Sequence, residues 1–131
     1  MKIQESAQNY LETILILSKR LPHVRSIDIV NQLSFSKPSI SIAIKNLREG
    51  GYVKVDSDGY ITLTDSGLEI AETMYERHTL LTDWLTFLGV DEKIAAEDAC
   101  RIEHVISAES FEAVKKHVYA NRELRSGAAQ V

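Results

Sequence analysis

Three residues of types that commonly bind metal ions lie close together near residue 100. They are Cys100, Glu103 and His104, which stand at positions i, i+3 and i+4. Because residues three and four apart are neighbours on a helix, a thiolate, a carboxylate and an imidazole could converge there on one cation. The helical periodicity places the apolar residues of this segment on nearly the opposite side, which we expect to face the core: Ile94, Ala95, Ile102, Val105 and Ile106.

Other interpretations of these side chains remain open at this point. Cys100 could be a small buried apolar residue and His104 an ordinary surface residue, which is the commoner fate of each type. Cys100 could also sense an oxidant or an organic ligand. A cysteine and a histidine one turn apart could form a nucleophile–base pair, but the sequence shows no third orienting group and no glycine-rich oxyanion loop. We therefore predict that the protein is not an enzyme.

Two other helical segments carry polar side chains on faces that we expect to be covered. His78 shares a face with a stripe of mostly apolar residues, so it points toward another element. A lone inward histidine is more often a core residue than a ligand. In the first helical segment, Glu5, Asn9, Glu12 and Ile16 share a face opposite the core stripe, and the apolar Ile16 indicates that this face also packs against something.

The segments that position these residues have the order of a winged helix-turn-helix followed by helices. Apolar spacing predicts helices over residues 3–17, 26–33 and 36–50, where Ser26 and Ser36 are the expected N-caps. A β-hairpin is predicted over residues 52–63, and helices over 65–88, 91–106 and 107–119. The fold class is therefore mostly α with a small β-hairpin wing. The predicted domains are residues 1–64 for DNA binding, 65–122 for a helical domain, and 123–131 for a disordered tail.

The third predicted helix has a core face and an unusual outer face. Ile40, Ile44 and Leu47 fall together, whereas Ile42 and Lys45 fall roughly opposite. An exposed Ile42 is explained if this face enters the major groove, where an aliphatic side chain can contact a thymine methyl group. Short hydroxyl side chains near the helix start could contact phosphates. The predicted DNA-binding residues are Ser36, Lys37, Pro38, Ser39, Ser41, Ile42 and Lys45.

Charge and composition agree with a protein that meets a polyanion at one end. The chain has 131 residues, 44% of them hydrophobic, and a net charge of −4. Residues 1–63 carry a charge of +2 and residues 64–131 a charge of −6, and residues 19–50 hold six basic against two acidic side chains. No apolar run is long enough to span a membrane, and no secretory signal is visible, so we expect a cytoplasmic protein.

Several motifs together resemble the diphtheria toxin repressor family of metal-dependent transcriptional regulators, including its short, manganese-sensing branch. They are Asn9-Tyr10-Leu11-Glu12, Ser36-Lys37-Pro38-Ser39, Leu63-Thr64-Asp65-Ser66-Gly67, Arg77-His78 and Ala99-Cys100-Arg101-Ile102-Glu103-His104. The resemblance implies a homodimeric repressor that binds double-stranded operator DNA when Fe²⁺ or Mn²⁺ is bound, and controls metal homeostasis genes. Carried over by position, the metal-ligand candidates are Asn9, Glu12, His78, Cys100, Glu103 and His104.

Some positions depart from the family pattern. Asn9 stands where family members have methionine or aspartate, and it offers only an amide oxygen. Cys100 agrees with the iron-sensing branch, whereas the manganese branch has a carboxylate there. Thr82 and Ala96 replace ligands of the iron branch's second site. The chain ends without an SH3-like domain, so it resembles the short form, in which helices four to six make the dimer surface. A thiolate favours Fe²⁺, and Zn²⁺, Co²⁺ or Ni²⁺ are expected to bind in vitro.

Overall fold

The computed structural model describes the backbone of residues 5–129 and the side chains of residues 5–121. The sequence predicts that the first helix begins at Ile3, which lies outside the described residues. The chain forms two compact units, Met1–Tyr75 and Glu76–Val131, and the boundary between them falls inside one long helix. Within the described residues, no helix is both long and apolar enough to cross a membrane.

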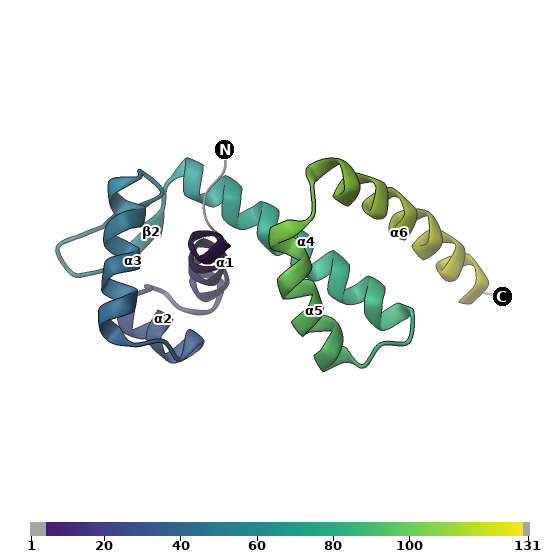
Figure 1. Ribbon diagram of the computed structural model, residues 1–131, viewed down its shortest axis with the longest axis horizontal. Helices are drawn as coiled ribbons and strands as arrows, with labels where there is room; N and C mark the ends of the chain where they lie inside the picture. Colours follow the sequence, from purple (N-terminus) through teal and green to yellow (C-terminus); the bar gives the residue numbers. More distant parts are fainter. Residues whose placement is uncertain (1–4, 130–131) are drawn as a thin grey trace. The chain divides into compact units, whose positions relative to one another are not determined.

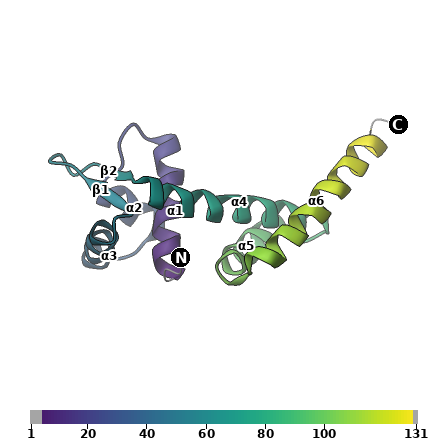
Figure 2. The same ribbon diagram turned by 90° about the horizontal axis from the view of Figure 1, so that it is seen from above.

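The first unit is a winged helix-turn-helix, as the sequence predicts. It contains α1 (Glu5–Arg20), α2 (Ser26–Leu33), α3 (Lys37–Glu49), β1 (Val53–Val55), β2 (Ile61–Leu63) and the start of α4 (Asp65–Phe87). The two strands pair antiparallel, with Val53 opposite Leu63 and Val55 opposite Ile61. Figure 1 shows this order of elements along the chain, and Figure 2 shows the hairpin projecting from the helices of this unit.

Local capping chemistry explains where the second and third helices begin. The Ser36 side chain accepts a hydrogen bond from the Ser39 amide, and Pro38 lies in the first turn, as predicted. At α2, however, the cap is Arg25 rather than the predicted Ser26, which is already helical. The Asp28 carboxylate accepts a hydrogen bond from the Arg25 backbone amide at 2.9 Å. The helix is therefore capped one residue earlier than it would be by Ser26.

The core of the first unit confirms the predicted inner face of α3. Ile40, Ile44 and Leu47 are all buried, and they pack with Leu11 and Ile29 of the two preceding helices. The hairpin is attached to the same body, because the Ile61 amide donates to the Val24 carbonyl at 2.7 Å. This core holds α3 with its opposite face exposed.

The second unit consists of the rest of α4, α5 (Glu92–Val105) and α6 (Ala108–Ala129). Its core cluster contains Leu80, Leu81, Ala99, Phe111 and Val118. The Asp91 side chain caps α5, and Ser107 accepts from the Ser110 amide at 3.0 Å at the start of α6.

The last helix is longer than expected. The sequence predicts its end at Tyr119 and a disordered tail over residues 123–131, but the structure has helix as far as Ala129. Residues 122–125 and 128–129 are mostly good helix formers, so intrinsic propensity supports the extension where the apolar periodicity fades.

Near the start of α6, Lys115 Nζ lies 3.1 Å from Glu76 Oε2, and this hydrogen bond raises the pKa of Lys115 above the ordinary lysine value.

The buried face of α5 agrees with the predicted one only in part, because Ala95 is buried and Ile102 and Ile106 pack against the core cluster. Ile94 and Val105 were expected in the core, but they are 51% and 75% exposed. The fully buried side chains of α5 are Ala95, as predicted, together with Ala99 and Glu103, which the predicted core face does not include. Alanines allow close approach between helices, and their small size hides this role in a pattern based on hydrophobicity. The correction places Glu103 in the interior of the second unit.

Candidate metal centre and DNA-reading surface

The structure brings together the three residues that the helical spacing singles out. One donor atom each of Cys100, Glu103 and His104 lies within 4.8 Å of the other two. All three belong to the last two turns of α5, so their proximity follows from helix geometry. Cys100 is accessible to solvent, whereas the His104 side chain is only 3% exposed.

Glu103 is the centre of a wider cluster in the second unit. Its carboxylate is fully buried, with Oε1 3.4 Å from Nε2 of His104 and Oε2 3.4 Å from Nδ1 of His78. His78 belongs to α4, so the second unit joins ligand candidates from two helices. The sequence-based expectation that His78 faces another element agrees with this arrangement.

The surroundings of Glu103 fit a divalent cation. Neither of its carboxylate oxygens accepts a hydrogen bond from the described part of the chain. A buried carboxylate without donors is costly, because the water that solvated it has not been replaced. A divalent cation bound by the carboxylate and the neighbouring imidazole and thiolate groups would supply the missing charge. The donor set of one carboxylate, two imidazoles and one thiol suits Fe²⁺, Mn²⁺ and Zn²⁺.

The two remaining ligand candidates lie on α1, in the first unit. Glu12 is 5% exposed, and Asn9 is half-buried. A buried glutamate is uncommon in folded proteins, because glutamate is among the residue types that are rarely fully buried. Its burial agrees with the expectation that the face carrying Glu12 and Ile16 is covered.

The predicted DNA-reading surface is exposed on α3 and the turn before it. All seven predicted residues, from Ser36 to Lys45, are exposed in the structure. Ile42 is 61% exposed, although the helix has an apolar core on its other side. This exposure confirms the position that the helical wheel assigns to Ile42.

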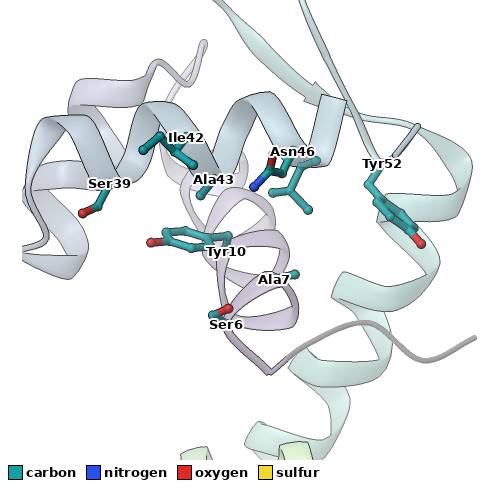
Figure 3. Close-up of a pocket in the computed structure, with 9 residues that line it drawn as sticks. Ser6, Ala7, Tyr10, Ser39, Ile42, Ala43, Asn46 and Tyr52 are labelled. Atoms are coloured by element: carbon teal, nitrogen blue, oxygen red, sulfur yellow. The ribbon is translucent and has the colours of Figure 1, made fainter. Parts of the chain in front are cut away.

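A hollow of about 370 Å³ lies beside this surface, between α1 and α3. Figure 3 shows that Ser39, Ile42 and Asn46 of α3 line it together with Tyr10 of α1 and Tyr52. Asn46 is not among the predicted DNA-binding residues, although the helical periodicity places it on the same face of α3 as Ile42. An asparagine side chain on this face can donate a hydrogen bond to an adenine base edge and accept another from it. Its residue type and its place on the face could therefore have identified it from the sequence.

Two family models match successive parts of the chain. The model described as "Iron dependent repressor, N-terminal DNA binding domain" matches residues 2–61. The model described as "Iron dependent repressor, metal binding and dimerisation domain" matches residues 64–122. The first match covers the winged helix-turn-helix, and the second covers the helices that carry His78, Cys100, Glu103 and His104.

Curated relatives include regulators from archaea and bacteria. The chain is 32% identical over 115 residues to an uncharacterized HTH-type transcriptional regulator of Methanocaldococcus jannaschii, covering 86% of this chain and 92% of that protein. It is 30% identical over 112 residues to the transcriptional regulator MntR of Escherichia coli, covering 86% of this chain and 72% of that protein.

Solved structures with the same fold include a manganese regulator and a manganese-dependent transcriptional repressor. The manganese regulator SloR has a TM-score of 0.77 at 27% identity, covering 91% of this chain and 55% of that chain. A manganese-dependent transcriptional repressor in complex with manganese has a TM-score of 0.78 at 29% identity, covering 86% and 52%. The chain thus spans about half the length of these solved structures.

Proposed function

We propose that this chain, which belongs to the family of iron dependent repressors, represses transcription by binding operator DNA as a homodimer when Fe²⁺ or Mn²⁺ is bound. The genes that it would control are those of metal homeostasis. The observation that best supports this function is the fully buried Glu103 carboxylate between two histidines and near a thiol. The first unit of the same chain carries α3, where the predicted DNA-binding residues are exposed.

The proposed metal ligands in the second unit are His78, Cys100, Glu103 and His104. Two of the solved structures described above are a manganese regulator and a manganese-dependent repressor, which supports Mn²⁺. The thiolate of Cys100 instead favours Fe²⁺ over Mn²⁺, because softer ligands select softer cations. Zn²⁺, Co²⁺ and Ni²⁺ are expected to occupy the site in vitro, since they stand above Fe²⁺ in the general affinity order.

The proposal for α1 rests on the sequence. Asn9 and Glu12 occupy ligand positions in the family resemblance, and α1 belongs to the unit that reads DNA. A ligand from α1 would allow the metal to act on that unit. Metal and operator would then each increase the affinity for the other by the same factor.

The proposed homodimer would use apolar surface of the second unit. Phe87, Leu88, Ile94 and Val105 are between 45% and 75% exposed in the single chain. So much exposed apolar surface on a small helical unit is typical of a protein interface. A two-fold dimer would present two copies of α3 to two half-sites of an operator.

The function is tested by measuring DNA affinity against metal. A high-affinity duplex is first selected from random DNA in the presence of Mn²⁺ under anaerobic conditions. Its affinity is then measured by fluorescence anisotropy with Mn²⁺, Fe²⁺, Zn²⁺ or a chelator. We expect metal to increase the affinity about 5- to 150-fold, the usual range of allosteric coupling. The metal-loaded protein should sediment as a dimer.

Variants of two histidines in the second unit separate metal gating from a general effect on the protein. His104→Ala should leave only weak, salt-sensitive DNA binding that does not respond to metal. The matched control is His117→Ala, because His117 lies on α6 and contacts Trp84 and Asn121 outside the proposed ligand set. The control should respond to metal like the natural protein. Equal DNA affinity with metal and with chelator in the natural protein would contradict the proposed function.

Substitutions on α3 should separate sequence reading from charge. Ile42→Ala should reduce discrimination at one base pair, by up to about 1–3 kcal/mol, because the thymine contact is lost. Lys45→Ala should weaken binding to all sequences and lower the slope of log K against log salt by about 0.9, as expected for one phosphate contact. Both side chains are exposed, so thermal unfolding should be almost unchanged. An unfolded Ile42→Ala, or one with unchanged specificity, would contradict the groove assignment.

A further inference from the structure

Arg77 connects the three helices of the second unit at the end of α5. Its Nη1 donates to the backbone carbonyl of Glu103 at 3.0 Å and to that of Ile106 at 3.0 Å. Its guanidinium carbon lies 5.4 Å from the centre of the Phe111 ring on α6. One side chain of α4 thus holds the last turn of α5 and the start of α6.

The two carbonyls that Arg77 binds are at the carboxyl end of α5. The last carbonyls of a helix have no partner within the helix, and the helix dipole makes this end attractive to a cation. Without donors from outside, such a final turn frays. Here the final turn contains Glu103 and His104, so its order determines where two of the candidate ligands lie.

Arg77 also stands next to His78 on α4. The same backbone segment therefore supplies one ligand candidate and the side chain that orients two others. His78 Nδ1 and Glu103 Oε2 are 3.4 Å apart, a separation that depends on how α4 and α5 are fastened at this point. We infer that Arg77 is a positioning residue of the metal centre, which holds Glu103 and His104 of α5 in place against His78 of α4.

Stability alone does not explain an arginine at this position. Its Nε is buried and has no hydrogen-bond partner among the described residues. A buried donor without an acceptor is destabilising, and a lysine would avoid this cost. The fork of the guanidinium group lets one nitrogen serve two carbonyls in a fixed geometry, which a flexible ammonium does less well.

The inference rests on the proposed metal function, and its test uses metal affinity with no DNA present. The full-length protein and its Arg77→Met variant are titrated anaerobically with Mn²⁺, and the absorption spectrum of Co²⁺ is recorded for each. Methionine keeps the apolar stem but removes both donors. We expect Kd for Mn²⁺ to rise about 10- to 100-fold, as for other residues that orient metal ligands, and the Co²⁺ spectrum to change. Helix content by circular dichroism at low temperature should stay the same.

A second variant and a matched control make the result decisive. If Arg77→Met does not fold, Arg77→Gln, which keeps one amide donor, tests the inference in its place. Its Kd for Mn²⁺ is expected to rise at least about 10-fold. Arg101→Met is the control, because Arg101 is an exposed arginine of α5 and its loss changes the net charge equally. Its affinity and spectrum should match those of the natural protein.

The outcomes separate this inference from the proposed function. Failure of the natural protein to bind metal would overturn the proposed function itself. Metal binding with natural affinity and an unchanged Co²⁺ spectrum in a folded Arg77 variant would overturn only the role of Arg77. Loss of thermal stability without any change in Kd would show that Arg77 is merely structural, and would also overturn the inference.

Discussion

Replacing Glu103 by leucine is expected to abolish metal binding and at the same time stabilise the metal-free protein. Glu103 is fully buried, and its two carboxylate oxygens accept no hydrogen bond from the described residues. Holding this group in the interior is costly without a cation, and leucine has a similar volume without the polar cost. Replacement of whole buried ion pairs by apolar residues of similar size has been neutral or has stabilised other proteins by about 1–4 kcal/mol.

The measurement is urea unfolding of the natural protein and of Glu103→Leu, with a chelator and with excess Mn²⁺. The variant should be about 1–4 kcal/mol more stable with chelator, and Mn²⁺ should not stabilise it further. The natural protein should gain about 4 kcal/mol at a metal concentration 1,000 times Kd. Glu97→Leu is the control, because Glu97 is exposed on the same helix, and its stability should change by about 0.5 kcal/mol or less. Stabilisation of Glu103→Leu by Mn²⁺ to the same extent as the natural protein would contradict the assignment of Glu103 as a metal ligand.

Gly67→Ala is expected to destabilise the DNA-reading unit strongly, although alanine is the better helix former. A Cβ atom at Gly67 would overlap the backbone carbonyl oxygen of Tyr52, which is also the acceptor for the Thr64 amide at 3.0 Å. The Thr64 hydroxyl donates to the Gly51 carbonyl at 2.6 Å and accepts from the Gly67 amide, so this junction is tightly connected. Backbone cannot move aside as a flexible side chain can.

The clash should cost about 3 kcal/mol or more, against a gain of about 1 kcal/mol in helix propensity. Thermal unfolding measures the loss, and Ser66→Ala is the control because Ser66 is exposed in the same first turn of α4. The control should leave stability almost unchanged. Because the wing and the start of α4 meet here, a folded Gly67→Ala should also bind operator more weakly. Greater stability in Gly67→Ala would show that the helix start is not packed against Tyr52.

Features that depend on neighbours in the chain could be predicted from the sequence. Ser36 and Pro38 specify the start of α3 because capping involves residues within one turn. The clustering of Cys100, Glu103 and His104 likewise follows from the helical repeat, and the exposure of Ile42 follows from the position of Ile40 and Ile44 in the core. Each of these conclusions needs only the geometry of one helix.

The tertiary structure decided which faces are buried and what they meet. The periodicity of α5 predicts a core face with Ile94, Ala95 and Val105, but packing buries Ala99 and Glu103 beside Ala95 and leaves the other two exposed. A periodic pattern identifies residues that share a face, whereas the partner helix determines which face is covered. The approach of His78 to Glu103 and the bonds from Arg77 to two carbonyls of α5 join residues more than twenty positions apart. Such contacts depend on how separate helices pack, and no local repeat in the sequence encodes them.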